Sequence, residues 1–327
     1  MNHLGRRPRL LYGRPFVSGL RRRQGAAGTP DRAGVWWVIA SATSYSLFTV
    51  FSKGVLDDLR PTDVLFWRFA IAAPVAWCAT AVRAARLGPT RVGAPAGPFL
   101  GAGGVFGVVA LLAFGALDHL SAALYVVIIY TYPAMVAVGA AALGRRPPRR
   151  VWVSIGITVI GIACTVPEVF DSPDADALGL VLTLGNALVY AIYVLGTGHL
   201  LGGDRAHRTD GLVASSYSFT GSLVFAAALL PFVGLRLPQD AATWFGLAGL
   251  GVVSTVIGGA TLLVGMRRLP PATAALVATL EPVLTLIWAM SLLGESLVAL
   301  QFVGAALVIG GVVWSQRVSP VPPGEPG

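Results

Sequence analysis

Long apolar stretches, separated by short polar connections, recur along almost the whole chain. They lie at about 34–54, 62–83, 97–117, 121–142, 151–167, 178–198, 211–233, 243–266, 272–293 and 297–315. Each is close to the roughly 20 residues with which an α-helix crosses about 30 Å of hydrocarbon. None shows the period of two that marks a strand of a membrane barrel. The pattern therefore predicts an all-α integral membrane protein with ten transmembrane helices.

Composition supports this prediction. Hydrophobic residues make up 55% of the 327 residues, whereas charged residues make up only 12%. A water-soluble domain of this length usually carries about twice that share of charge, because its surface must be solvated. We therefore expect lipid to cover much of the apolar surface.

The net charge of +9 could suit nucleic acid, so the positions of the basic residues decide between the alternatives. Arginines crowd the segment before the first stretch and then occupy every second connection. The intervening connections carry few basic residues, namely Lys53, Arg60 and Arg236. The positive-inside rule then places both termini in the cytoplasm. A nucleic-acid partner is not predicted.

The two halves of the chain align weakly with each other. The segment "GVWWVIASATSYS" matches "GLVLTLGNALVYA", which pairs Tyr45 with Tyr190. The segment "TYPAMV" matches "LEPVLT", which pairs Pro133 with Pro282. Five spans in each half would place the second half upside down in the membrane relative to the first. We therefore predict two inverted five-helix repeats.

This division also assigns the remaining segments. We expect a flexible basic cytoplasmic arm at 1–33, a first repeat at 34–167, an acidic outer loop at 168–177, a second repeat at 178–315 and a disordered tail at 316–327. The arm would contact anionic membrane lipids. Cys78 and Cys164 lie within apolar stretches and lack metal-ligand spacing, so no metal site is predicted.

The ordered set of these features resembles the drug/metabolite transporter superfamily, in its EamA-like branch. The matching residues are "FWRFAIAA" in the second span, "MRRLPPATAAL" between the eighth and ninth, and "LEPV" and "LLGES" within 280–296. The resemblance covers about 34–315 and implies a ten-helix inverted-repeat fold that carries small metabolites, amino acids or toxic compounds, often outward. The first repeat departs from the family pattern, because Arg145 follows Leu143 and Gly144 where Leu-Gly-Glu is common.

An ionisable residue and a helix breaker, Glu281 and Pro282, stand at the centre of the ninth span. Pro282 has no amide hydrogen to donate to the carbonyl of Ala278, and Pro133 repeats this defect in the fourth span. We therefore predict a kink in each helix. Carbonyls freed at this depth need protein, polar side chains or a water-filled cavity beside them. We expect that cavity at the interface of the two repeats.

Two interpretations of Glu281 are open. Burial of an unpaired carboxylate is costly, so the protonated form is favoured. In the functional interpretation the carboxyl loads and releases a proton, or binds an amine of the substrate. In the structural interpretation a neutral acid donates a hydrogen bond to a carbonyl freed by Pro282.

Further candidates line the expected cavity. Arg68, within the second span, could bind a substrate carboxylate, although snorkelling or pairing with Asp63 or Asp118 is the interpretation we favour. Aromatic and amide side chains of the central helices supply the rest: Tyr45, Tyr130, Tyr132, Asn186, Tyr190, Tyr193 and Trp288. Ordinary helix packing is the alternative for these side chains.

Motifs for enzymatic chemistry are missing from the sequence. It contains neither a Walker-type phosphate loop nor a cluster of serine, histidine and acid residues, so we predict no enzyme and no cofactor. We expect a secondary transporter of the bacterial inner membrane, a proton-coupled exporter of a small organic solute that works by alternating access. A non-transporting membrane scaffold or sensor is one alternative, and an integral-membrane enzyme is another. A homodimer is left open.

Overall fold

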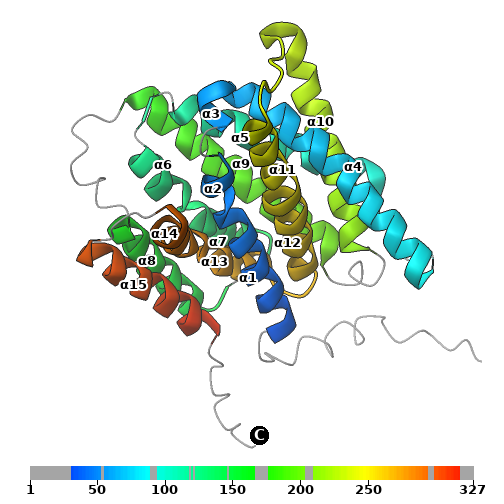
Figure 1. Cartoon of the computed structure of the whole chain (residues 1–327). Helices are drawn as coiled ribbons and strands as arrows, with labels where there is room; N and C mark the ends of the chain where they lie inside the picture. Colours follow the sequence, from blue (N-terminus) through cyan, green and yellow to red (C-terminus); the bar gives the residue numbers. More distant parts are fainter. Residues whose placement is uncertain are drawn as a thin grey trace, which may run out of the picture. The chain divides into compact units, whose positions relative to one another are not determined.

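Helices account for nearly all the residues that the structure, a computed structural model, describes (Figure 1). The described residues are 31–52, 55–88, 94–117, 119–120, 122–145, 147–165, 176–202, 209–293 and 298–316. The elements are α1 (Arg32–Ser46), α2 (Phe48–Ser52), α3 (Val55–Asp58), α4 (Pro61–Leu87), α5 (Ala96–Leu117), α6 (Ala122–Ile129), α7 (Tyr132–Ala142), α8 (Arg149–Thr165), α9 (Ala177–Leu201), α10 (Gly211–Val233), α11 (Ala241–Gly249), η3 (Leu250–Ile257), α12 (Gly258–Met266), α13 (Pro271–Ala278), α14 (Glu281–Leu293) and α15 (Ala299–Gln316). Apart from a few residues at their edges, the predicted arm, acidic loop and tail lie outside the described residues.

Eight helices in the described part of the chain, some of them built from consecutive elements, are long and apolar enough to cross a membrane. The other two predicted spans, at 151–167 and 297–315, correspond to α8 with 17 residues and α15 with 18. The all-α class of the prediction is confirmed, since the described residues contain no strand. The count of ten membrane spans in two inverted repeats stays a prediction.

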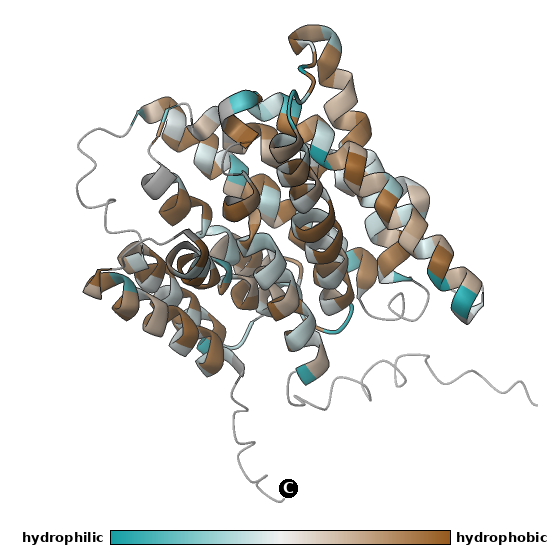
Figure 2. Cartoon of the chain, in the orientation of Figure 1, coloured by the Kyte–Doolittle hydropathy of each residue, from teal (hydrophilic) through white to brown (hydrophobic). Residues whose placement is uncertain are grey.

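Many helices carry large exposed apolar side chains. The ribbon in Figure 2 accordingly has hydrophobic colours over much of its length. Phe232, Phe245 and Trp36 are 86%, 73% and 69% exposed. Soluble monomers rarely expose contiguous apolar surface on this scale, because water disfavours it. Lipid would cover these faces, so the structure is that of a multi-pass membrane protein.

Two of the predicted spans are interrupted near their middles. Two residues separate α6 from α7, and two residues separate α13 from α14. Pro133 and Pro282 are each the second residue of the helix that follows the interruption. Proline fits there because the first turn of a helix has no use for its amide hydrogen. The structure thus interrupts each span at the position where the sequence predicted a kink, and the kink itself stays a prediction.

A third irregularity, which the sequence did not predict, lies in the eighth span. The π-helical segment η3 joins α11 to α12. The hydroxyl of Thr255 donates a hydrogen bond of 2.8 Å to the carbonyl of Leu250, five residues earlier. Single π-helical turns inside membrane or globular helices are frequent at functional sites. Thr255 is completely buried.

Glycines allow α5 and α10 to pack with their backbones in contact. A Cβ atom at Gly103 would lie 1.9 Å from the carbonyl oxygen of Ser218, and one at Gly221 would lie 2.0 Å from that of Leu100. The hydroxyl of Ser222 donates a hydrogen bond of 2.9 Å to the carbonyl of Gly103. Small residues serve this purpose in membrane helices, where close packing replaces the hydrophobic effect.

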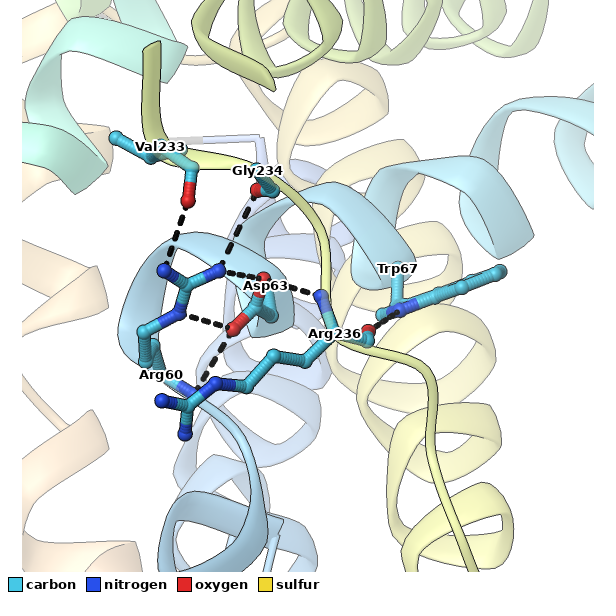
Figure 3. A network of polar contacts seen from close by, with 6 residues as sticks. All are labelled: Arg60, Asp63, Trp67, Val233, Gly234 and Arg236. Carbon is cyan, nitrogen blue, oxygen red and sulfur yellow. Dashed lines mark hydrogen bonds and ion pairs between the residues drawn. The ribbon is translucent and has the colours of Figure 1, made fainter. Parts of the chain in front are cut away.

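A polar network fastens the beginning of α4 to the end of α10 and the connection that follows it. Figure 3 shows its members, which are Arg60, Asp63, Trp67, Val233, Gly234 and Arg236. The guanidinium of Arg60 donates two hydrogen bonds, of 2.8 and 2.9 Å, to the carboxylate of Asp63, and a third of 2.8 Å to the carbonyl of Val233. The backbone N–H of Arg236 donates to the same carboxylate at 3.0 Å. Asp63 is fully buried, and both oxygens of its carboxylate accept hydrogen bonds.

The other end of this helix pair is fastened in a similar way. Arg83, near the end of α4, donates a hydrogen bond of 2.5 Å to the carboxylate of Asp210, which caps the beginning of α10. Between the two ends, the indole N–H of Trp77 donates to the hydroxyl of Thr220 at 3.0 Å. Helices α4 and α10 are therefore joined along their whole length.

Candidate functional site

The two interrupted spans meet in the interior. Helices α7 and α13 are in contact, and the hydroxyl of Tyr132 donates a hydrogen bond of 3.2 Å to the carbonyl of Ala275. Tyr132 is buried and is the first residue after the break in the fourth span. The break in the first half of the chain therefore lies against the helix that leads into the break of the second half.

Glu281, the first residue of α14, faces polar groups in this region. Its carboxyl is in hydrogen-bonding position to the hydroxyl of Tyr130, which occupies the break between α6 and α7. It also interacts electrostatically with the guanidinium of Arg68. The only acid near the centre of a predicted span thus interacts with both a phenol and a cation in the interior. Both interpretations of Glu281 stay predictions, because either protonation state can bond to a hydroxyl.

Arg68 points into the interior from α4. Its Nε donates a hydrogen bond of 2.5 Å to the hydroxyl of Thr255 in the π-helical segment. Its guanidinium carbon lies 5.3 Å from the ring centroid of Phe48 and 5.6 Å from that of Phe69. Cation–π contacts of this length offset part of the cost of burying the charge. The wider turn at η3 supplies a hydroxyl that a regular helix would direct elsewhere.

The predicted pairing of Arg68 with Asp63 is wrong. The carboxylate of Asp63 forms an ion pair with Arg60. Arg60 lies three residues earlier, on the same side of the helix as Asp63. Arg68 lies five residues after Asp63, which turns its side chain by about 140° around the helix axis. The other predicted partner, Asp118, lies outside the described residues.

Tyrosine rings gather beside these charged residues. The rings of Tyr132 and Tyr190 meet edge to face at 4.6 Å, and Tyr190 and Tyr193 stack at 6.0 Å. Phe106 of α5 adds a ring 5.2 Å from Tyr193. Tyr45 of α1 interacts electrostatically with Glu281 and with the hydroxyls of Tyr132, Tyr190 and Tyr193. The structure therefore brings most of the predicted lining together from α1, the α6–α7 connection, α7 and α9. We call this group the tyrosine cluster: Tyr45, Tyr130, Tyr132, Tyr190 and Tyr193.

Asn186 lies one turn before Tyr190 on α9 and is completely buried. Its amide nitrogen donates a hydrogen bond of 2.8 Å to the hydroxyl of Tyr125. Its amide oxygen is buried without a donor among the described residues. Native proteins rarely leave such an oxygen unsatisfied, so it is an acceptor that a bound solute or water can use.

Trp288 has a different setting from the tyrosine cluster. Its indole N–H donates a hydrogen bond of 2.8 Å to the hydroxyl of Ser46 at the end of α1. The contact joins α14 to α1, so it holds elements of the two halves together. The structure therefore gives Trp288 a defined packing partner.

Sequence reasoning missed three residues of the site. Tyr125 was missed because it lies further from Pro133 than Tyr130 and Tyr132 do. Phe106 was missed because it resembles any apolar residue of α5. Thr255 gave no signal, since threonine is common in membrane helices and the π-helical turn that aims it has no sequence signature.

Comparison with known proteins assigns the chain to a family. The family model described as "EamA-like transporter family" matches residues 32–166 and again residues 177–316. The chain belongs to the EamA-like transporter family. The resemblance to the drug/metabolite transporter superfamily is thereby confirmed.

Curated relatives carry transporter names. The chain is 28% identical over 175 residues to the threonine/homoserine exporter RhtA of Escherichia coli (strain K12), which covers 52% of this chain and 55% of that protein. The chain thus spans about half the length of this relative. It is 26% identical over 293 residues to the uncharacterized transporter YcbK of Bacillus subtilis (strain 168), covering 86% of this chain and 90% of YcbK.

A solved crystal structure shares the fold. It superposes with a TM-score of 0.75 at 15% sequence identity, and the match covers 86% of this chain and 96% of the other. At this identity the likeness concerns the fold alone.

Proposed function

We propose that this chain is a secondary transporter that exports a small organic solute by alternating access. The observation that carries the proposal is the meeting of two interrupted helices, which gathers Glu281, Arg68 and the tyrosine cluster inside a membrane protein. Broken helices with charged groups at the break are the usual setting of substrate and ion sites in transporters. Membership of a family of transporters supports the same activity.

The proposal includes ten spans in two inverted repeats, with both termini in the cytoplasm of a bacterial cell. The two separate matches of the family model support the repeats, as do the breaks at the equivalent prolines Pro133 and Pro282. The distribution of arginines supports the orientation. Outward transport is supported by the name of the exporter RhtA.

Proton coupling in this proposal depends on Glu281. An ionised carboxylate would hold the amine of a solute, while the amide oxygen of Asn186 and the faces of the tyrosines hold its remainder. A proton that enters from the outside neutralises the carboxylate and removes the attraction for the amine. The solute and the proton then compete for one group, so proton uptake releases the solute on the outer side.

Reconstitution in liposomes tests the function. Vesicles are loaded in turn with labelled threonine, a nucleoside, a sugar and a cationic dye, and efflux is followed with and without an inward proton gradient. We expect the gradient to accelerate the loss of at least one solute from vesicles with wild-type protein. Glu281→Gln should abolish this acceleration, and Glu281→Asp should preserve part of it.

Two outcomes would count against the proposal. If no solute leaves faster than from protein-free vesicles, transport fails and a scaffold or sensor gains weight. If Glu281→Gln responds to the gradient as the wild type does, the chain still transports, but the carboxyl has only a structural role.

A further inference from the structure

A cavity of about 500 Å³ lies among the ends of helices from both halves of the chain. Ala140 and Val151 contribute to its wall from α7 and α8, and Gly198 and Met266 contribute from α9 and α12. The beginning of α13 completes it. Neither Glu281 nor any member of the tyrosine cluster lines it. Its volume is in the range of pockets that hold small molecules.

The charged side chains of this cavity all have one sign. Arginines supply them, namely Arg145, Arg267 and Arg268, and the described lining contains no acid. Asp31 forms an ion pair of 3.2 Å with Arg268, where both side chains are nearly half exposed, so part of that charge is already compensated. The positive charge contributed by Arg145 has no such ion pair among the described residues.

The backbone fixes the position of Arg145. The N–H of Gly144 donates to the carbonyl of Ala141 at 3.0 Å, and that of Arg145 donates to Ala140 at 2.8 Å. Gly144 has a φ of 81°, a left-handed conformation that glycine adopts without strain. This conformation and the two hydrogen bonds form the common glycine-terminated end of a helix. The guanidinium of Arg145 lies 3.9 Å from the place of a Cβ atom at Gly202, at the end of α9. The side chain thus reaches from the first half of the chain to the second.

The beginning of α13 adds a second source of positive charge to the same cavity. Helix α13 begins at Pro271, and the next two residues, Ala272 and Thr273, also line the cavity. Their N–H groups belong to the first turn, which has no carbonyl partners within the helix. The beginning of a helix carries a partial positive charge and attracts anions. Buried Met266 and Leu269 provide apolar wall beside it.

The sequence adds a contrast between the halves. Leu143, Gly144 and Arg145 align with Leu293, Gly294 and Glu295, so equivalent positions carry opposite charges. Glu295 lies outside the described residues. The positive charge at Arg145 is therefore a property of one half, and this residue lines the cavity.

We propose that this cavity binds an anionic group, a carboxylate or a phosphate, through Arg145 and the beginning of α13, with the ligand's apolar part against Met266 and Leu269. Guanidinium groups bind such oxyanions by charge-assisted, paired hydrogen bonds. In the proposed transporter the cavity would collect solutes that carry a carboxylate or phosphate besides their amine, on the arginine-rich side of the membrane. That role rests on the proposed function, whereas binding itself does not.

A binding experiment on the purified full-length protein in detergent tests the site. The melting temperature is measured against rising concentrations of glutarate, of inorganic phosphate and of glutaramide, the uncharged analogue of glutarate. We expect at least one anion to raise the melting temperature and glutaramide to have no effect. Arg145→Gln should weaken the apparent affinity about 10- to 100-fold, because it removes the charged donor and leaves the beginning of α13 in place.

The matched control is Arg86→Gln, which removes the same charge from an exposed position at the end of α4 and outside the cavity. It should bind as the wild type does. A further arm adds phosphatidylglycerol to the micelles. If the lipid alone stabilises the protein, and Arg145→Gln removes that effect, the anionic group belongs to a lipid headgroup.

The proposal is overturned if Arg145→Gln and Arg86→Gln bind all anions equally, or if glutaramide binds as well as glutarate. The melting temperatures without ligand show whether either variant is misfolded, which is not expected of exposed arginines. Anion binding that depends on Arg145, together with no transport in liposomes, would leave this site standing while the proposed function fails.

Discussion

Removal of the carboxylate at Asp63 should destabilise the contact between α4 and α10 more than its single ion pair would suggest. The carboxylate accepts two bonds from the Arg60 side chain, one of 3.2 Å from the Arg60 backbone and one of 3.0 Å from the Arg236 backbone. In Asp63→Ala all four donors lose their acceptor in a place where Asp63 itself has no exposed surface.

The size of the effect follows from burial. Loss of one partner of a fully buried ion pair costs about 3–5 kcal/mol, because the other charge is left without compensation. The side chain of Arg60 is 36% exposed, so water can recover part of this cost. Each buried N–H without a partner adds about 1 kcal/mol or more. We expect Asp63→Ala to lower the free energy of unfolding by about 3 kcal/mol.

Reversible unfolding in mixed micelles measures this quantity, in a cycle of Arg60→Ala, Asp63→Ala and the double variant. The double variant should be less destabilised than the sum of the single ones, since it leaves no unpaired charge. A loss below about 0.5 kcal/mol for Asp63→Ala, in the range of ordinary surface substitutions, would refute the reasoning. Strict additivity of the two single effects would refute it as well.

Three other substitutions test separate parts of the structure. Gly221→Ala places a Cβ atom 2.0 Å from a backbone oxygen and should cost at least about 2 kcal/mol by overpacking, whereas Gly185→Ala has open space and should be neutral or stabilising in the same unfolding assay. Thr255→Val removes the hydroxyl that accepts a hydrogen bond from Nε of Arg68. It should lower the free energy of unfolding by about 1–3 kcal/mol, whereas Thr255→Ser should not. The backbone N–H of Leu178 donates to the carboxylate of Asp176 and holds the pKa of that carboxyl below its usual range. The ionised carboxylate therefore stabilises the fold above the unfolded-state pKa of about 3.9. This stabilisation is lost as the pH falls through the lower folded-state pKa. Asp176→Asn should accordingly flatten the fall in melting temperature below about pH 4, and an unchanged slope would contradict this assignment.

Much of the fold could be predicted, because the length and hydropathy of an apolar stretch are enough to identify a membrane span. The prolines at 133 and 282 signalled a disturbance in two spans, but the sequence could not tell how neighbouring elements would accommodate it. That depends on whether they supply partners for carbonyls near the interruption, as the hydroxyl of Tyr132 does for the carbonyl of Ala275 in α13. The π-helical segment could not be predicted either, because its i→i+5 hydrogen bonding has no sequence signature.

The site was predictable where a residue was out of place in its surroundings. Glu281 stood out as an acid in an apolar stretch, and Arg68 as a base in another. Their partners could not be predicted, because Thr255 and Tyr130 reach them only through the packing of helices distant in sequence. The cavity beside Arg145 was likewise hidden, since it is formed by the ends of several elements.

The most direct test of the central claim couples proton movement to solute movement in one vesicle. A solute that the protein transports is loaded into liposomes with a trapped pH indicator, and its outward gradient is the only driving force. The account predicts that the lumen becomes more acidic as the solute leaves, and that Glu281→Gln abolishes this acidification. Solute efflux that leaves the lumenal pH unchanged, in wild type and Glu281→Gln alike, would contradict it.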